Sequence, residues 1–234
     1  MKIARRFTKS GQNVFDAVEW TRRSSRIGNS DGSTVFEMKD AEVPASWSQL
    51  ATDIVVSKYF RKAGVPQAAP TDNEASNEEA GAGLGASLGD GPAGSTPERR
   101  SQVSLTGSET SVRQVVHRLA GCWQHWGEKF GYFSSKRDAE AFYDELAFML
   151  IHQCAAPNSP QWFNTGLNFA YGISGPAQGH WIADHATGRV GLAKDAYTHP
   201  QPHACFIQAV RDDLVGEGGI MDLWTREARL FKYG

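Results

Sequence analysis

Residues 111–130, SVRQVVHRLAGCWQHWGEKF, are the stretch that decides the fold. Large apolar residues recur in it at spacings of three and four, which is typical of an amphipathic helix entered from Thr110 or Ser111. These residues are Val112, Val115, Val116, Leu119, Trp123 and Trp126. The two tryptophans and Phe130 are of the kind that stacks on nucleic-acid bases, but at helical spacing they more often belong to a core. The stretch therefore predicts a helix that packs against other elements.

A second helix is predicted directly after the first. Ser135 and Asp138 have the spacing of a capping box, and Pro157 prevents the helix from continuing. Its buried stripe is expected to contain Phe142, Leu146, Met149 and Leu150. A last helix is expected from about Gly219 to the end of the chain. The region 112–234 is therefore predicted to be mostly helical.

The N-terminal part predicts a small α+β lobe over residues 1–65. Residues 34–39 alternate apolar and charged side chains like a half-buried strand, and residues 40–44 are turn-like. Ser46 and Gln49 have the spacing of a capping box at the start of a helix. The stripe of this helix and the residues that stop it are Trp47, Leu50, Ile54, Lys58 and Tyr59, then Gly64 and Pro66.

Residues 66–111 predict a disordered linker between the two parts. The segment has no aromatic residue and contains seven glycines, at positions 81, 83, 85, 89, 91, 94 and 107. Such a composition cannot bury enough apolar surface to offset the entropy of ordering the backbone.

The composition indicates a soluble globular protein, which we expect in the cytoplasm. Of the 234 residues 40% are hydrophobic and 21% charged, and the net charge is -2. No stretch approaches the roughly 18 to 20 apolar residues that a membrane span needs. Without a basic stripe, duplex nucleic acid is an unfavourable partner. The three cysteines, Cys122, Cys154 and Cys205, form neither a disulfide framework nor a paired metal motif, which indicates a reducing compartment.

Residues 157–166 predict a very short helix. Ser159 has the character of an N-cap, Pro160 of the first helical residue and Gly166 of the terminator. Exposed amides at a helix start attract a phosphate or a carboxylate. The alternative is an ordinary capped loop that binds only water.

Residues 199–203 predict an extended segment that leads into a strand at 204–210. Cys205, near the start of that strand, is a redox group or nucleophile if it is exposed, and otherwise an inert buried thiol. Cys122 and Cys154 are expected on the packing stripes of helices. A zinc site of Cys205 with His199 and His203 lacks further ligands at the required spacing.

Asp212 and Asp213 follow the predicted strand. Two adjacent carboxylates can bind a metal ion or sugar hydroxyls, and the alternative is a solvated turn. A hairpin-like segment with a turn at 187–188 contains His180, Asp184 and His185, for which we expect surface or packing roles.

Five motifs, in this order, resemble the N-terminal region of the adenosylcobalamin-dependent (class II) ribonucleotide reductases. They are EVPASWSQ at 42–49, KYFR at 58–61, NSPQWFNTG at 158–166, GPAQGHW at 175–181 and HACFI at 203–207. The resemblance implies the fold class α/β: a mostly helical N-terminal region leading into the first strand or strands of a ten-stranded α/β barrel, incomplete in this chain.

The resemblance also implies roles for five residues. Cys205 matches the first member of the redox-active cysteine pair, and Ser159, Pro160 and Ala204 match residues that line the substrate. Asp212 matches an aspartate that contacts a regulatory deoxynucleotide near a dimer interface. Its neighbour Asp213 departs from the serine of some relatives, which leaves the effector contacts open.

The implied reaction converts ribonucleotides to 2′-deoxyribonucleotides for DNA synthesis. In this family a cysteine thiyl radical, created with adenosylcobalamin, removes a ribose hydrogen, and the cysteine pair supplies two electrons. Neither Cys122 nor Cys154 resembles the radical cysteine, so that residue and the cobalamin site are expected outside this chain. The implied partners are a ribonucleotide, a deoxynucleotide effector, a thioredoxin-type reductant and, in a homodimer, a second copy.

This chain alone is therefore expected to be inactive. The alternative is a non-catalytic nucleotide-binding or interaction module, which the missing radical cysteine suggests.

Overall fold

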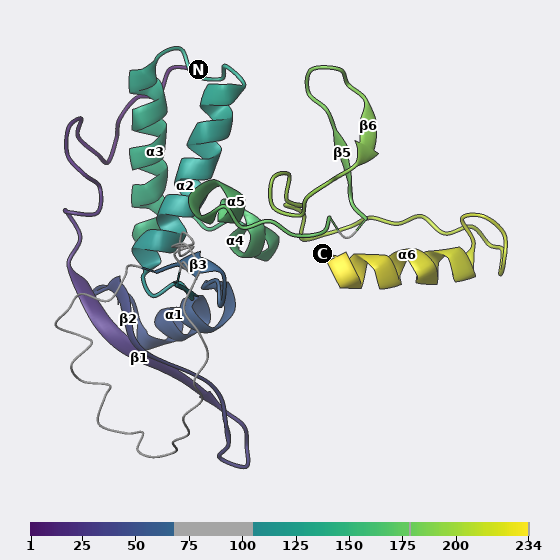
Figure 1. The fold of residues 1–234 in the computed structure, drawn as a ribbon, viewed down its shortest axis with the longest axis horizontal. Coiled ribbons are helices and arrows are strands. Elements are labelled where there is room, and N and C mark those ends of the chain that lie inside the picture. Colours follow the sequence, from purple (N-terminus) through teal and green to yellow (C-terminus); the bar gives the residue numbers. More distant parts are fainter. Residues whose placement is uncertain (68–104, 178, 234) are drawn as a thin grey trace, which may run out of the picture.

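The computed structural model describes residues 1–67, 105–177 and 179–233 as a mixture of helices and small sheets (Figure 1). In chain order its elements are β1 (Trp20–Gly28), β2 (Thr34–Pro44), α1 (Gln49–Ile54), the π-helix η1 (Val55–Tyr59), β3 (Val65–Pro66), β4 (Thr106–Gly107), α2 (Val112–Lys129), α3 (Lys136–Ile151), α4 (Ser159–Asn164), α5 (Leu167–Tyr171), β5 (Trp181–Ala183), β6 (Val190–Leu192) and α6 (Ile220–Tyr233). The strands pair as β1–β2, β3–β4 and β5–β6, and these described parts contain no closed barrel.

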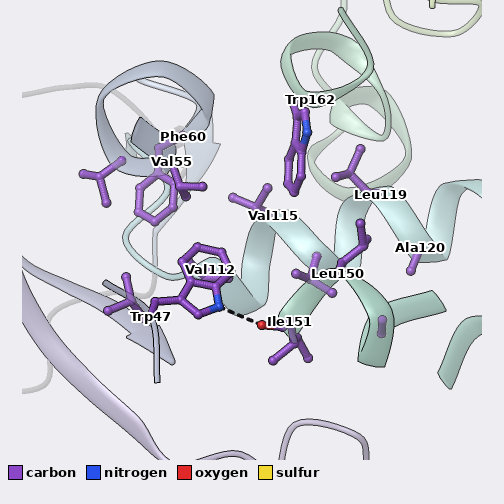
Figure 2. Packing of buried hydrophobic residues seen from close by; sticks show 14 of the residues in the cluster. Trp47, Val55, Phe60, Val112, Val115, Leu119, Ala120, Leu150, Ile151 and Trp162 are labelled. Atoms are coloured by element: carbon purple, nitrogen blue, oxygen red, sulfur yellow. Dashed lines mark hydrogen bonds between the residues drawn. The ribbon is translucent and has the colours of Figure 1, made fainter. Parts of the chain in front are cut away.

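One hydrophobic core joins residues from both sides of the segment 68–104 (Figure 2). Val43, Trp47 and Val56 pack in it with residues of α2 and α3. The Trp47 indole Nε1 donates a hydrogen bond of 2.7 Å to the carbonyl oxygen of Ile151, at the end of α3. The stretches 1–65 and 112–151 therefore stabilise each other through shared packing.

The two long helices begin where the sequence predicts. Ser111 caps α2 in a reciprocal capping box with Gln114, and the Ser135 hydroxyl accepts a hydrogen bond from the amide of Asp138 at the start of α3. The expected stripe of α2 is buried at its first four positions and half-buried at the two tryptophans. In α3, Leu150 is buried and the other three stripe residues are half-buried.

The predicted start of the N-terminal helix was wrong by two residues. Ser48, not Ser46, is the N-cap of α1, and its hydroxyl accepts a hydrogen bond from the Ala51 amide. The expected stripe is also wrong, because Thr52, Val55 and Val56 form the buried face, while Leu50 and Ile54 are 69% and 44% exposed. The helix also ends earlier than Gly64, because the backbone is extended at Phe60.

Strand β1 was not predicted, and the expected turn at 40–44 belongs to β2. The two strands pair antiparallel from Trp20 opposite Pro44 to Gly28 opposite Thr34. Their register shifts between Arg23 and Ser25, and on the opposite strand Asp40 has a positive φ of 57°. The turn-like composition of 40–44 therefore marks a bulge within a strand.

Most of the predicted linker, residues 68–104, lies outside the described residues. At its edges β3 pairs with β4, through Val65 opposite Gly107 and Pro66 opposite Thr106. Glu109, two residues beyond β4, is fully buried. These edges are therefore part of the fold.

The C-terminal part is more open. Strands β5 and β6 form the expected hairpin, with Gly188 at a positive φ of 67°, and α6 confirms the expected last helix. The strand predicted at 204–210 is wrong for the described structure, in which this segment has no regular structure. A strand needs a neighbour for its backbone donors and acceptors, and the described residues provide none there.

Within the same described ranges, no helix is long and apolar enough to cross a membrane.

Candidate functional site

Helix α4 carries two of the predicted site residues, Ser159 and Pro160. Its N-cap is Asn158, whose backbone is still extended and whose side chain accepts a hydrogen bond from the Gln161 amide. The prediction of Ser159 as N-cap was therefore wrong, because Ser159 already lies in the first turn. Its hydroxyl instead lies 3.1 Å from the Tyr59 hydroxyl at the end of η1.

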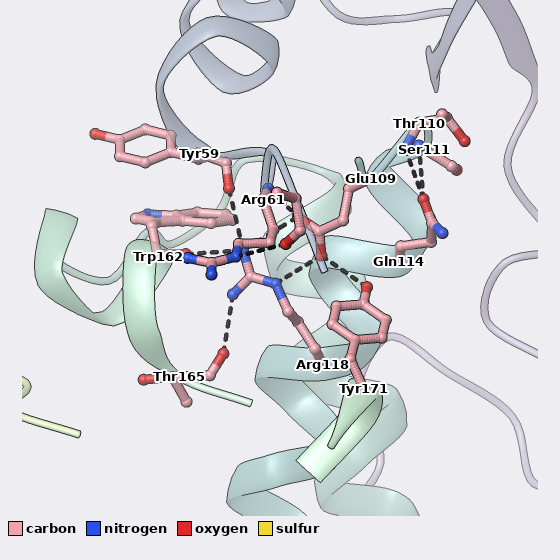
Figure 3. A network of polar contacts seen from close by, with 11 residues as sticks. Tyr59, Arg61, Glu109, Thr110, Ser111, Gln114, Arg118, Trp162, Thr165 and Tyr171 are labelled. Carbon is pink, nitrogen blue, oxygen red and sulfur yellow. Dashed lines mark hydrogen bonds and ion pairs between the residues drawn. The ribbon is translucent and has the colours of Figure 1, made fainter. Parts of the chain in front are cut away.

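Arg118 of α2 reaches the backbone at the C-terminal end of α4 (Figure 3). Its side chain is fully buried. The guanidinium donates hydrogen bonds to the carbonyl oxygens of Trp162 (2.8 Å), Thr165 (2.9 Å) and Tyr59 (3.1 Å). One side chain therefore joins α2, the last turn of α4 and the end of η1.

Glu109 balances the charge of Arg118. Its carboxylate accepts hydrogen bonds from Arg118 Nε (2.7 Å), from the Tyr171 hydroxyl (2.7 Å) and from the Arg61 amide (2.7 Å). Burial, together with the nearby carboxylate, raises the pKa of Tyr171 well above its usual range, so this hydroxyl stays a donor. A buried ion pair persists only when its polar atoms are satisfied, and here both partners are.

Gly166 allows α4 to lie directly on α2. It has a positive φ of 81°, and a Cβ there would stand 2.0 Å from the carbonyl oxygen of Arg118. Only glycine fits such a close approach in this conformation. The terminator role expected for Gly166 is confirmed.

The three cysteines lie in different environments. Cys122 is buried in α2, as expected, and burial raises the pKa of its thiol to about 12. Cys154 is exposed beyond the end of α3, so its expected position on a packing stripe was wrong. Cys205 is exposed in the extended segment. Among the described residues, no group of three or more His, Cys, Asp or Glu side chains is arranged to hold a metal ion.

The predicted site residues lie in two places. Ser159 and Pro160 share α4, whereas Ala204, Cys205 and Asp212 are exposed in the segment between the hairpin and α6. No hydrogen bond or ion pair of the described residues joins these two places. Their roles in binding and redox chemistry remain predictions.

A pocket of about 540 Å³ lies between residues 209–211 and the start of α6, and Asp212, the next residue along the chain, is not among its lining residues. Its charged lining consists of Arg211, Glu217, Asp222 and Arg226. The adjacent Asp213 carboxylate accepts hydrogen bonds from the amides of its own turn. This arrangement agrees with a turn at Asp213 and leaves Asp212 exposed.

Sequence reasoning missed Arg118 and Glu109. Arg118 stands three residues after Val115 and four before Cys122, so helical spacing alone places it on the buried face. Glu109 had no comparable signal, because it lies in the segment whose composition predicted disorder.

A second feature missed from the sequence is a groove of about 890 Å³ between α2, α5, the β5–β6 hairpin and residues 197–203. Its lining combines aromatic residues, histidines and Lys129. We refer to it below as the hairpin groove.

Comparison with known proteins places this chain in a family. Residues 21–153 match a family model described as class II vitamin B12-dependent ribonucleotide reductase. The chain is 55% identical over 234 residues to the vitamin B12-dependent ribonucleotide reductase of Agrobacterium fabrum, and 54% identical over 235 residues to that of Bradyrhizobium diazoefficiens. The protein of the same name from Rhodopirellula baltica is 37% identical over 225 residues. These alignments cover 96% to 100% of this chain but 18% of each relative.

Proposed function

Since the chain belongs to the class II vitamin B12-dependent ribonucleotide reductases and corresponds to their N-terminal region, we propose that it supplies part of the substrate and effector sites of such an enzyme. The reaction is the reduction of ribonucleotides to 2′-deoxyribonucleotides, and we take ribonucleoside diphosphates as the substrates. The observation that carries this proposal is the fixed position of α4, which Arg118 and Glu109 hold from inside the fold.

Because α4 is held in one position, its side chains can contact a substrate in a defined geometry. Ser159 and Pro160 are proposed to contact the ribose and phosphate of the substrate. Because Arg118 binds the carbonyl oxygens of α4 before any ligand arrives, little ordering entropy remains to be lost on binding.

The exposed thiol of Cys205 is proposed as one member of the redox pair, with Ala204 beside it at the substrate. Each turnover removes the 2′-hydroxyl as water and takes two electrons from two thiols, which become a disulfide. A thioredoxin-type reductant then returns the pair to the thiol state by thiol–disulfide exchange. The exposure of Cys205 supports this role, because exchange requires access to the sulfur.

The family's name implies a cobalamin cofactor. We propose its adenosyl form and a site outside this chain, where the radical cysteine is also expected. When bound, the cofactor supplies the radical. The residues of this chain are proposed to position the substrate and to carry one thiol.

We further propose that residues 204–210 form the first strand of the ten-stranded barrel once neighbouring strands are present. The exposed Ile207 supports this, because the described fold leaves its side chain wholly uncovered. Asp212 is proposed to contact the deoxyribose of an effector, beside the pocket at the start of α6, in an enzyme that forms homodimers.

The test is multiple-turnover deoxynucleotide formation by the full-length reductase that contains this chain. Cys205→Ser should abolish turnover, because a hydroxyl cannot form a disulfide. Cys122→Ser and Cys154→Ser are the matched controls and should turn over as wild type does. Wild-type turnover in the Cys205 variant, or loss of turnover in a folded control variant, would contradict the assignment. Parallel assays with di- and triphosphates decide the substrate.

A further inference from the structure

Tyr59, in the KYFR motif at 58–61, contacts one of the residues that are proposed to meet the substrate. Its hydroxyl lies 3.1 Å from the hydroxyl of Ser159, which is 100 residues away in sequence, and either oxygen can be the donor. Within residues 1–67, 105–177 and 179–233, neither hydroxyl has another hydrogen-bond partner. The pair therefore decides how both hydroxyls are oriented.

The Tyr59 side chain is held by contacts that do not involve its hydroxyl. Its ring stacks on the indole of Trp162, with centroids 5.4 Å apart and an interplanar angle of 25° (Figure 3). The ring of Phe163 lies at the same centroid distance, tilted by 42°. The carbonyl oxygen of Tyr59 accepts a hydrogen bond of 3.1 Å from Arg118. The phenol oxygen is therefore presented to α4 from a fixed position.

The Ser159 side chain, by contrast, depends on its partner for its orientation. Ser159 is the first residue of α4, and its side chain is half-buried. Arg118 fixes the backbone of this helix through carbonyl oxygens, but a serine side chain can still rotate between staggered rotamers. The hydrogen bond with Tyr59 restricts the serine oxygen to the rotamer that faces the tyrosine.

The chemistry of a phosphate decides which of the two hydroxyls donates. The oxygens of an ionised phosphate accept hydrogen bonds and do not donate them. A serine hydroxyl carries one hydrogen and two acceptor lone pairs. If Ser159 gives its hydrogen to a phosphate, it can only accept from Tyr59. Tyr59 is then the donor, and each hydrogen is used once.

We propose that Tyr59 is a positioning residue for substrate binding, which donates a hydrogen bond to Ser159 Oγ and so directs the serine hydrogen to the substrate phosphate. This inference rests on the proposed function, in which Ser159 contacts the substrate. Because the hydroxyl is oriented before the substrate arrives, less rotational freedom is lost on binding. A donor behind the serine also polarises its O–H group and strengthens the bond to the phosphate.

The test is steady-state kinetics of the full-length reductase that contains this chain, with CDP or CTP, whichever the wild-type enzyme reduces. Tyr59→Phe keeps the stacked ring and removes the hydroxyl. It should raise KM at least about fivefold and change kcat by less than about twofold, because a phosphate contact is made equally in the bound substrate and in the transition state. Ser159→Ala should raise KM at least about tenfold for the same reason.

The matched control is Tyr143→Phe. It removes a tyrosine hydroxyl that also takes part in a hydrogen bond, 2.8 Å from His117 Nδ1, but that bond joins α3 to α2 and does not involve α4. This variant should change KM by less than about twofold.

The double variant separates positioning from packing. In the Ser159→Ala background, Tyr59→Phe should raise KM by less than about twofold, because the serine through which it acts is gone. A general loss of packing at Tyr59 would instead raise KM by the same factor in both backgrounds.

Three outcomes would overturn the proposal. An unchanged KM in Tyr59→Phe, while Ser159→Ala raises it, would remove the role of Tyr59 and leave the proposed function intact. Equal factors in the two backgrounds would make the effect of Tyr59 structural. An unchanged KM in Ser159→Ala would overturn both this proposal and the proposed contact of Ser159 with the substrate, whereas the redox assignment of Cys205 keeps its own test.

Discussion

The region around α2 and α3 buries its apolar side chains in one core, whereas the segment from the hairpin to α6 leaves its apolar side chains exposed. In the first region Val115, Leu119 and Ile151 are fully buried. In the second, Ile207 is 104% exposed and Phe231 88% exposed. Burying one such side chain contributes about 1.5–3 kcal/mol. The first region therefore obtains this energy within the described fold, and the second does not.

The largest expected difference between the two regions is in thiol reactivity. Cys122 is buried and its pKa is raised to about 12, so its modification requires the core to open. Cys205 is exposed and needs no opening. In native conditions a thiol reagent should modify Cys205 at least about a thousandfold faster than Cys122. Mass spectrometry after timed quenching measures both rates, and exposed Cys154 serves as the reference. Equal rates would mean that the core around α2 is open.

The second largest expected difference is in how much the ion pair of each region contributes to the free energy of unfolding. Arg118→Met leaves the Glu109 carboxylate buried without its partner, which should destabilise the fold by about 3–5 kcal/mol. The matched change, Arg226→Met, breaks the exposed Arg226–Asp222 pair of α6 and should leave the unfolding midpoint unchanged within error. Urea unfolding followed by circular dichroism checks both. A small effect of Arg118→Met would remove the observation on which the proposed position of α4 depends.

The two regions should also differ in the cost of replacing a glycine that has a positive φ. Gly166→Ala places a methyl group against the carbonyl oxygen of Arg118 and should cost about 3 kcal/mol or more. Gly188→Ala, in the hairpin turn, meets no atom within 4 Å, so the cost is conformational strain of about 1 kcal/mol. Hydrogen exchange of α4 and of the hairpin reports each change locally. Equal effects would show that α4 does not depend on the close approach.

The smallest expected effect is a pH dependence. Burial raises the pKa of Glu145, but hydrogen bonds from the Thr8 hydroxyl and from the amides of Thr8 and Phe7 outweigh it, so the pKa is lowered overall. A carboxyl with a lower pKa in the folded state contributes stability above its unfolded pKa, and this stability is lost as the pH falls through the folded value. Glu145→Gln should therefore lower Tm by about 2–4 °C at pH 7 and have little effect at pH 3.

The control for this experiment is Asp222→Asn. A hydrogen bond from Arg226 lowers the pKa of Asp222 too, but this carboxyl lies in the uncovered α6. No residue of the described core belongs to α6, so the stability that this pair contributes is confined to that helix, and Asp222→Asn should leave the pH profile of the Tm of the core unchanged. A profile that changes equally in both variants would contradict the contrast between the two regions.

How much of the fold could be predicted depended on whether an element's own residues carry its pattern. Helix α2 was predicted because its apolar stripe and its cap lie within its sequence. Strand β1 was missed because Arg22, Arg23 and Arg26 interrupt any alternation, and its structure comes from pairing with β2. The strand predicted at 204–210 shows the reverse case, in which the composition favours a strand but the described residues supply no partner.

The residues of the candidate site also divide into those that a local sequence motif identifies and those that only packing brings together. Short-range motifs identified Ser159, Pro160 and Cys205 as candidates. The side chain that fixes α4 could not be assigned this way, since Arg118 binds carbonyl oxygens 44 and 47 residues away in sequence. The hairpin groove likewise gathers residues from four separate segments. Contacts of this kind arise from packing and have no local signature.

The π-helix η1 limits how the length of this chain can vary. Its hydrogen bond from the Phe60 amide to the Val55 carbonyl oxygen spans five residues, one more than an α-helical turn. Deleting one residue from Val55–Tyr59 would restore α-helical spacing and rotate the following residues by about 100° around the helix axis. Tyr59 would then point away from Ser159. Insertions and deletions that a surface loop tolerates would therefore be selected against in these five residues.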